Sequence, residues 1–325
     1  MDLSELRTWL IGELASANLT LTELDGDASF RRYYRIRLGH ETYVAMYSPP
    51  DKIPLAPFVA VANAYHEAGL YVPTIHAMNL QHGFLLLEDI GEKSLAVVTE
   101  ARDSEVNAYY ERCIAQLPAV ASVRGTALGP LPVFDKAFMM NELERTHTWL
   151  LKDYFNCDES MLARAQDWFE SICARVDSMT KVGVHRDYHS RNIFFHNEQV
   201  VLIDFQDAVL APWPYDLVSL IEDSYQMLSQ PLREHLLHVS YERLEHGCHT
   251  FVDFYHAYTL VAIQRLLKVA GIFARLGLRD DKMQFLGWIA PALNLLQRAV
   301  ADSSSDSAWL PVVEQWQAQA MEKIV

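Results

Sequence analysis

Cysteine is scarce in this sequence, and its spacing excludes the structures that depend on it. Only Cys113, Cys157, Cys173 and Cys248 occur among 325 residues. They form no CxxC pair and match no zinc-ligand spacing, so neither a disulfide framework nor a zinc ribbon is expected. We expect four buried thiols in a protein of a reducing compartment.

Basic residues are also few. The 27 lysines and arginines stand against 42 acidic residues, which gives a formal net charge of -15 at pH 7. Nucleic acids and anionic membranes are bound through basic patches, so this balance disfavours both as partners. An acidic chain is compatible with a cationic substrate, but acidity is also the ordinary state of a soluble enzyme.

Long apolar runs are missing as well. No stretch reaches the roughly 18 apolar residues that indicate a membrane-spanning helix. The most apolar segment, 251–276, is interrupted by Asp253, Gln264, Arg265 and Lys268. The first residues, MDLSELRTWLIGELA, are acidic and amphipathic and lack the basic start of a signal peptide. We therefore expect a soluble cytoplasmic protein.

Half of the residues are hydrophobic, and periodic apolar segments run through nearly the whole chain. At this length two lobes are the default expectation. Residues 1–90 predict a small antiparallel β lobe of five strands with one inserted helix. Its expected elements are a leading helix over 3–16, strands over 19–24 and 33–38 and in TYVAMY, the inserted helix over 56–68, and strands in YVPTIHAMNL and GFLLLEDIG.

From residue 91 to residue 325 the pattern is mainly helical, which predicts a large helical lobe and places the whole chain in the α+β class. The expected helices are 101–121, 135–154, 159–180, 215–229, 231–246, 250–276, 281–299 and 308–323.

The exception is the segment 184–210, VHRDYHSRNIFFHNEQVVLIDFQDAVL. Two apolar runs flank the polar turn HNEQ (196–199), which predicts a hairpin in which Asn192 pairs with Ile203. Asn192 and Asp204 then emerge as neighbours at the same open end. An amide oxygen beside a carboxylate suits Mg²⁺, which keeps several waters and takes other ligands from substrate phosphates.

Asp187 lies five residues before Asn192 in a polar loop. A carboxylate there can accept the proton of a hydroxyl as it attacks phosphorus. The order H-x-D-x-x-x-x-N, apolar strand pair and I-D-F matches the phosphoryl-transfer template of kinases. Asn and Asp also end hairpins as simple turn formers, but the complete set with its spacing favours a functional site.

A zinc site at His189 and His196 is the alternative for the same hairpin. Their spacing suits no standard ligand pair, and the neighbouring oxygens favour magnesium.

These residues resemble the aminoglycoside phosphotransferase and choline kinase branch of the protein-kinase-like fold. The resemblance extends over nearly the whole chain, and it implies that Asp187 is the catalytic base and that Asn192 and Asp204 hold Mg²⁺. It also implies that Asp216, in PWPYDLVSL, is a helix-capping acid, which is equally its ordinary structural role.

Three separate blocks are similar to a narrower group, the bacterial anomeric kinases of cell-wall recycling. They are GDASFRRYYRI at 26–36, EDIG at 88–91 and QRLLKVAGIFARLGLRD at 264–280. Those enzymes phosphorylate N-acetylmuramate and N-acetylglucosamine at the C1 hydroxyl, so the resemblance implies ATP and Mg²⁺ as cofactors and a small sugar as substrate.

The sequence departs from protein kinases where they place a lysine on the third strand and a glutamate on the next helix. Met46 or Tyr47 stands at the lysine position, and the only glutamate of the helix, Glu67, is too late to pair. We expect the turn GDASFRRYY to replace this pair. The small residues Gly26 and Ser29 would let backbone N–H groups approach the phosphates, and the side chains that could supply the missing charge are Arg31 and Arg32.

A second departure is Gln206, which stands where protein kinases have the glycine of DFG, and which disfavours activation-loop switching but not metal binding. The connector LLLEDIG is expected to receive the adenine, with backbone groups around Glu88 and Ile90 at its edge.

The acceptor is expected on two helices of the large lobe. The first offers polar groups on adjacent turns and a tryptophan that could stack on a sugar ring, and the second offers a basic patch on an apolar helix. The patch suits an anionic sugar such as N-acetylmuramate. An equally weighted alternative is that these basic residues form salt bridges between the lobes or at the surface. The expected residues are Asn141, Glu142, Arg145 and Trp149, then Gln264, Arg265 and Lys268.

The sequence thus predicts a monomeric, ATP- and Mg²⁺-dependent sugar kinase. Two alternatives stay open. An aminoglycoside or other small-molecule kinase would bind its cationic acceptor on an acidic floor of Glu142, Glu144, Glu222 and Asp223. A nucleotide-binding pseudokinase scaffold is suggested by the missing lysine and glutamate.

Overall fold

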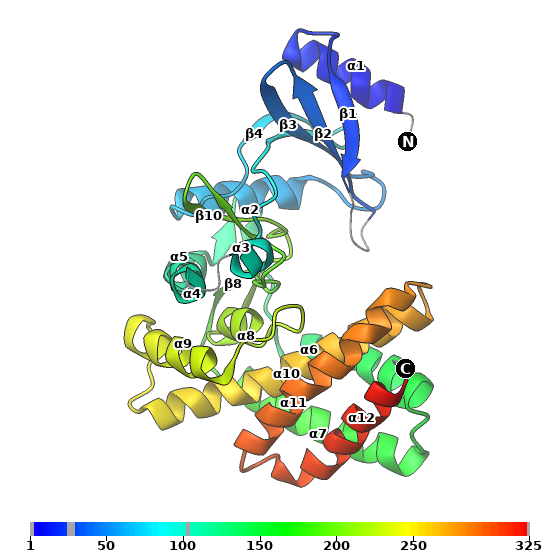
Figure 1. Cartoon of the computed structure of the whole chain (residues 1–325), viewed down its shortest axis with the longest axis vertical. Coiled ribbons are helices and arrows are strands. Elements are labelled where there is room, and N and C mark those ends of the chain that lie inside the picture. Colours follow the sequence, from blue (N-terminus) through cyan, green and yellow to red (C-terminus); the bar gives the residue numbers. More distant parts are fainter. Residues whose placement is uncertain (1–2, 25–29, 102–104, 324–325) are drawn as a thin grey trace.

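The first lobe is built on a five-stranded antiparallel sheet of order β1-β2-β3-β5-β4. The computed structural model describes residues 3–24, 30–101 and 105–323, and it has this sheet at one end and a larger helical lobe at the other (Figure 1). The elements of the first lobe are α1 (Leu3–Leu14), β1 (Thr20–Leu24), β2 (Arg32–Leu38), β3 (Glu41–Tyr47), α2 (Ala56–Glu67), β4 (Ile75–Asn79) and β5 (Phe84–Glu88).

The two faces of the sheet follow from the alternation of side chains along β3. Successive strand residues point to opposite faces. Ala45 is buried against α1 in one apolar cluster, whereas Val44 and Met46 pack into the main core, which includes α2. The helix α2 presents Phe58, Val61, Ala62 and Tyr65 to that core at helical spacing.

The helical lobe surrounds α10 (Phe251–Leu278), whose middle is buried along its whole circumference. By length and composition α10 could cross a membrane, but 83% of its most apolar window is buried inside the protein. Its elements before the hairpin are α3 (Leu95–Ala101), α4 (Val106–Ile114), α5 (Leu117–Ser122), β6 (Gly125–Thr126), β7 (Gly129–Pro130), α6 (Lys136–Arg145), η2 (Thr146–Tyr154) and α7 (Glu159–Asp177). Those after it are α8 (Tyr215–Ile221), α9 (Gln230–Arg243), α10, η3 (Met283–Trp288), α11 (Ile289–Asp302), η4 (Ser307–Trp309) and α12 (Leu310–Glu322).

The hairpin has the register that its sequence predicts. β9 (Ile193–His196) pairs with β10 (Gln199–Leu202), with Phe195 opposite Val200. Asn197 and Glu198 have φ angles of 48° and 59°, the left-handed backbone of a two-residue hairpin turn. A second antiparallel pair was not expected. In it β8 (Lys181–Val184), before the hairpin, pairs with β11 (Val209–Pro212), after the hairpin.

The α+β class and the five-stranded antiparallel sheet are confirmed, whereas the lobe boundary between residues 90 and 91 stays a prediction. Several helix bounds differ. The helix expected over 135–154 changes from α-helical α6 to the wider π-helix η2, and the one expected over 215–229 ends at Ile221. Of the cysteines, Cys113 and Cys173 are buried as expected, whereas Cys157 and Cys248 are only partly buried.

The change to a π-helix coincides with a close contact between η2 and α10. A Cβ atom on Gly271 would lie 2.6 Å from Thr146 Cα and 2.7 Å from its backbone nitrogen. The Thr146 hydroxyl donates a hydrogen bond to the Leu267 carbonyl at 2.8 Å. The glycine therefore lets the two backbones meet, which sequence periodicity does not reveal.

Candidate active site

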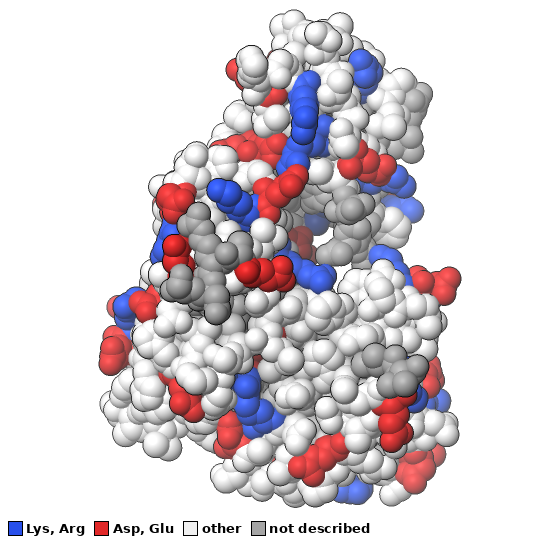
Figure 2. All heavy atoms as spheres, viewed as in Figure 1, with Lys and Arg blue, Asp and Glu red and all other residues white. Residues whose placement is uncertain are grey.

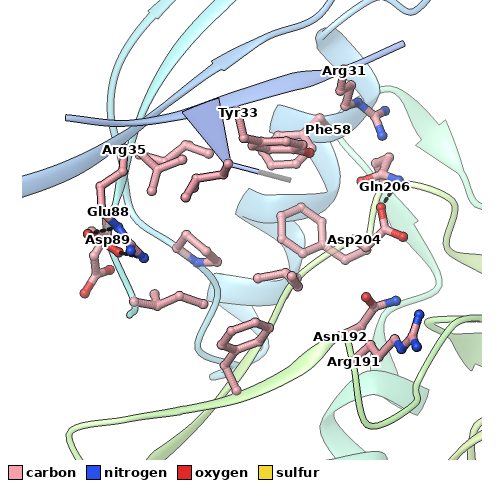
Figure 3. A pocket seen from close by; sticks show the side chains of 18 of the residues that line it. Arg31, Tyr33, Arg35, Phe58, Glu88, Asp89, Arg191, Asn192, Asp204 and Gln206 are labelled. Carbon is pink, nitrogen blue, oxygen red and sulfur yellow. Dashed lines mark hydrogen bonds and ion pairs between the residues drawn. The ribbon is translucent and has the colours of Figure 1, made fainter. Parts of the chain in front are cut away.

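A cleft of about 850 Å³ lies between the two lobes, within the range of about 300–1,000 Å³ that small-molecule sites occupy. Figure 2 shows the molecule hollowed at this level, and Figure 3 shows the side chains that line the cleft. The first lobe contributes Tyr33 and Arg35 of β2 and Arg31 just before it. The helical lobe contributes Asn192, just before β9, and Asp204, just after β10, both at the open end of the hairpin.

Asn192 and Asp204 meet as the hairpin register predicts. The Ile203 backbone N–H donates to the Asn192 carbonyl at 3.0 Å. The Asn192 side-chain Nδ2 donates to the Asp187 carbonyl at 3.0 Å, which turns its Oδ1 away from that bond. Asp204 has a φ of 61°, a backbone conformation that L-residues adopt rarely and that clusters at functional sites.

These two residues fit a divalent cation of the magnesium type. Among the described residues there is no group of three or more His, Cys, Asp or Glu that could hold a metal by itself, so a structural zinc site has no support there. One carboxylate with one amide oxygen is the sparse set that Mg²⁺ uses when waters and substrate phosphates complete its shell. Gln206 Nε2 donates to Asp204 Oδ1 at 2.9 Å and so orients this carboxylate.

The loop before Asp187 is held by hydrogen bonds from its backbone to the carboxylate of the buried Asp216. The Asp216 carboxylate accepts the N–H groups of His185 at 2.7 Å and Arg186 at 2.9 Å, and Arg186 has a φ of 80°. The expectation that Asp216 caps a helix is therefore wrong: Pro214 is the N-cap of α8, and Asp216 holds the loop before Asp187 instead.

The Asp187 carboxylate lies among cations. Its side chain is 34% exposed, and Lys268 Nζ lies 4.0 Å from its Oδ1. Burial alone would raise the pKa of Asp187, but the charges of Lys268, His189 and Arg186 hold that pKa well below its ordinary value. Asp187 is therefore ionised and able to accept a hydrogen bond from a hydroxyl.

Glu142 neutralises two of the cations around Asp187. Its Oε1 lies 2.5 Å from Arg186 Nη2 and 3.8 Å from Lys268 Nζ. Burial lowers the pKa of Lys268, but Glu142, Tyr215 and Asp187 together raise it. This buried cluster joins α6, the Asp187 loop and α10.

The other expected acceptor residues are dispersed. Gln264 and Arg265 are buried in α10, and Arg265 is close enough to Asp187 to lower its pKa. Arg145 lies near Arg275, whose pKa is lowered by burial and by the like charges of Arg279 and Arg145. Asn141 lines a separate groove between α6 and α7, and Trp149 is half-buried at the edge of the core.

Of the residues expected to bind nucleotide, Glu88, Ile90 and Arg31 line the cleft. The Glu88 side chain turns away and accepts hydrogen bonds from Tyr71 Oη at 2.5 Å and Thr74 Oγ1 at 2.9 Å. Arg32 is 61% exposed and pairs with Glu23 at 3.2 Å, so the structure separates the two arginines. Gly26 and Ser29 lie outside the described residues.

We predict that Arg31→Met raises the KM for ATP about tenfold or more and that Arg32→Met leaves it nearly unchanged. Loss of one charge-assisted hydrogen bond costs about 1.5–3 kcal/mol, and about 1.4 kcal/mol is tenfold. Steady-state kinetics with ATP varied would measure both, and Arg32→Met is the control from the neighbouring position. An equal effect of the two substitutions would contradict the assignment.

The position of the missing lysine is apolar. Met46 is fully buried on β3 in the same cluster as Phe58 and Tyr65 of α2, and Glu67 is exposed. Phe205, next to Asp204, packs on Phe58 with ring centroids 4.8 Å apart. Apolar packing thus joins α2 to the segment after β10 that holds Asp204, whereas protein kinases use an ion pair at the lysine position.

Sequence reasoning missed Arg191, which lines the cleft directly beside Asn192 (Figure 3). The signal was a charged residue immediately before Asn192, one of the two expected metal ligands. It also missed the partners of Arg35, Asp89 at 2.9 Å and Glu92, because these pairs join the sheet to the connector.

The two-lobed fold, the interlobe cleft and the three oxygen-bearing side chains Asp187, Asn192 and Asp204 define a kinase-like phosphotransferase. A family model described as the phosphotransferase enzyme family matches residues 20–255. The chain belongs to this phosphotransferase family.

The similar curated proteins carry one name. The chain is 33% identical over 296 residues to the N-acetylmuramate/N-acetylglucosamine kinase of Pseudomonas aeruginosa. The aligned region covers 89% of this chain and 86% of the relative. The protein of the same name from Neisseria meningitidis serogroup B is 29% identical over 303 residues, or 90% of each chain.

Solved structures agree in fold. Choline kinase LicA from Streptococcus pneumoniae has a TM-score of 0.65 at 13% identity and covers 94% of this chain and 100% of its own. The ADP-bound aminoglycoside phosphotransferase APH(2'')-Ib has a TM-score of 0.62 at 16% identity and covers 93% and 100%. Both likenesses establish the protein-kinase-like fold.

Proposed function

We propose that this phosphotransferase transfers the γ-phosphoryl group of ATP to the C1 hydroxyl of N-acetylmuramate or N-acetylglucosamine, in recycling of peptidoglycan. The observation that carries the proposal is that Asn192 and Asp204 line one cleft and that the Asn192 side chain donates a hydrogen bond to the Asp187 carbonyl at 3.0 Å. The names of relatives that match nearly the full length support the acceptor. We further propose that the protein is a soluble cytoplasmic monomer.

In the proposed reaction the acceptor hydroxyl oxygen forms a bond to the γ-phosphorus as the bond to the β,γ-bridging oxygen breaks, and ADP leaves with that electron pair. Asp187 accepts the hydrogen bond of the attacking hydroxyl and receives its proton late, because its low pKa makes it a weak base. Asn192 and Asp204 are the proposed ligands of Mg²⁺, which would neutralise charge on the phosphates. Positioning supplies most of the rate.

We propose that the acceptor binds where α6 and α10 meet the Asp187 loop. Glu142 and Lys268 contact each other and the Asp187 loop, and Arg265 and Arg145 extend the positive potential along α10 and α6. An anionic sugar such as N-acetylmuramate suits this side of the cleft. The remaining proposed acceptor residues, which lie farther from Asp187 or deeper in the core, are Asn141, Trp149 and Gln264.

The acidic floor that an aminoglycoside would need has little support. Glu222 is 1% exposed and pairs with Arg233 at 2.7 Å and Arg298 at 2.5 Å. Asp223 accepts hydrogen bonds from the Ser190 backbone and side chain at 3.0 and 2.5 Å. Carboxylates that are buried and paired cannot bind a polycation without leaving their partners unpaired.

Release of ADP with Mg²⁺-ATP and a panel of acceptors tests the proposal. The panel contains N-acetylmuramate, N-acetylglucosamine, glucose, kanamycin and choline. We expect turnover on the two N-acetyl sugars and little on the others. Turnover on kanamycin would keep the mechanism and replace the substrate. Nucleotide binding with no turnover on any acceptor would favour a pseudokinase scaffold.

We predict that Lys268→Met or Arg265→Met lowers kcat/KM for N-acetylmuramate about tenfold more than for N-acetylglucosamine. Only the first sugar carries a carboxylate, and loss of a partly buried charge pair costs about 1.4 kcal/mol or more. Steady-state kinetics on both sugars would measure the ratio, with the exposed Lys152→Met as the control. An equal loss on the two sugars would mean that Lys268 acts only through Asp187.

A further inference from the structure

Arg191 is the unassigned cation of the cleft. Three arginines line it among the described residues: Arg31, Arg35 and Arg191. Arg35 is neutralised by Asp89 at 2.9 Å and by Glu92. The Arg191 guanidinium instead lies over aromatic rings, and within the described residues it pairs with no carboxylate. Its charge is therefore available to an anion in the cleft.

Arg191 lies beside the two proposed metal ligands. It directly precedes Asn192, and Figure 3 shows its side chain beside Asn192 and below Asp204 on the same rim of the cleft. The cations Lys268 and Arg186, which lie near Asp187, both pair with Glu142. Their positive charges are therefore already compensated. Arg191 is thus the uncompensated cation beside the proposed metal ligands.

The aromatic neighbours hold this arginine in place. The guanidinium carbon lies 3.6 Å from the centroid of the Tyr225 ring and 5.5 Å from that of Trp288. The two rings meet edge to face, with centroids 5.0 Å apart. Stacking of a guanidinium on aromatic rings contributes about 0.5–2 kcal/mol, enough to restrict the side chain while its N–H groups stay free for a ligand.

The backbone at Tyr225 is linked to the Asp187 loop through the carboxylate of Asp223. Asp223 Oδ1 accepts the Tyr225 backbone N–H at 2.8 Å, and Asp223 Oδ2 accepts the N–H of Ser190, the residue before Arg191, at 3.0 Å. Trp288 reaches the same place from η3, which packs against α10. Three segments distant in sequence therefore converge on one guanidinium.

We propose that Arg191 binds a non-bridging oxygen of the transferring γ-phosphoryl group and stabilises its charge in the transition state, and that Tyr225 and Trp288 position it. A planar guanidinium presents paired N–H donors to phosphate oxygens. Pre-aligned donors of this kind act where charge develops during transfer, without reorganisation. Arg191 thereby supplies, from the helical lobe, positive charge that no lysine on β3 provides.

This inference rests on the phosphotransferase activity and not on the identity of the sugar. We expect Arg191→Met to lower kcat about 10²- to 10³-fold, the usual effect of removing one pre-aligned donor. Affinity for ADP should change little, whereas the tighter binding of ADP with aluminium fluoride, which mimics the transferring group, should be lost. Arg191→Lys should fall between, because it keeps the charge without the planar donors.

Two sugars separate the phosphoryl group from an acceptor carboxylate as the ligand of Arg191. The proposal requires an equal loss of kcat on N-acetylmuramate and N-acetylglucosamine. A loss confined to N-acetylmuramate would overturn it and make Arg191 a contact of the lactyl carboxylate. Weaker ADP binding with unchanged kcat would also overturn it. If neither sugar is a substrate, the binding of ADP with aluminium fluoride still decides the question.

The control is Arg164→Met, since Arg164 also lies over a ring, 5.3 Å from the Trp309 centroid, but on α7 away from the cleft. It should leave every parameter unchanged. Tyr225→Phe keeps the ring face and should retain kcat, whereas Tyr225→Leu should lower kcat with little change in the KM for ATP. Equal kcat for the two Tyr225 variants would overturn the positioning role. Thermal unfolding verifies that each variant is folded. If Arg191→Met is not folded, Arg191→Lys replaces it in the test.

Discussion

We expect asparagine in place of Asp187 to lower kcat about 10²- to 10⁴-fold, the range that loss of a positioned general base produces. The substitution keeps the shape of the side chain but removes the charge that accepts the hydroxyl hydrogen bond. The loop itself should persist, because it is held by Asp216 through the backbone of His185 and Arg186. Affinity for ADP should therefore stay within a few-fold of wild type.

The pH dependence of kcat is a second test of the Asp187 carboxylate. Because Lys268, His189 and Arg186 depress the pKa of Asp187, its ionised form persists as pH falls from 8 to 5, and kcat should not decline over that window on its account. Lys268→Met removes the first of these charges, so the acid limb should move to higher pH. The control Asp153→Asn, on an exposed position, should change neither quantity. A wild-type acid limb near pH 6 that vanishes in Asp187→Asn would contradict this account.

Substitution of Asp204 should act through the metal. Asp204→Asn should raise the Mg²⁺ concentration for half-maximal rate at least about 10- to 100-fold, since even the loss of an outer-shell partner costs that much. Asp204 contributes the charged ligand of the proposed pair, and Asn192 the neutral one. Binding of Mn²⁺ to the protein with ADP, followed by electron paramagnetic resonance, measures the same loss without turnover.

Asp207→Asn is the matched control, because Asp207 lies three residues away, lines the same cleft and also accepts a hydrogen bond from Gln206 at 3.1 Å. It should shift the Mg²⁺ requirement far less than Asp204→Asn. Equal shifts for the two substitutions would mean that Asp204 contributes only general negative charge.

The hairpin and the placement of two oxygen-bearing side chains at its open end could be predicted because they depend on local rules. A two-residue turn and the period of two along a strand fix which residues face one another, so Asn192 and Asp204 follow from the register alone. The five strands were found for the same reason. The α+β class then needed only the contrast between this alternation and the helical spacing of the remaining chain.

The charge environment of Asp187 could not be predicted, because it joins residues that are remote in sequence. Glu142, Arg186 and Lys268 come from α6, the Asp187 loop and α10, and only the packing of those elements brings them together. Asp216 was misjudged in the same way: its position near a helix start suggested a cap, whereas its carboxylate meets the backbone of a loop about 30 residues earlier. The stacking of Arg191 on Tyr225 and Trp288 also needs three separate segments.

The most direct test of the account is the structure of the product formed from N-acetylmuramate and Mg²⁺-ATP, determined by phosphorus nuclear magnetic resonance. We predict one sugar phosphate whose phosphorus couples to the anomeric proton, and no product from the sugar with its C1 hydroxyl blocked as a methyl glycoside. Both should be absent with Asp187→Asn. Phosphate on another hydroxyl, or equal turnover of the methyl glycoside, would contradict the account.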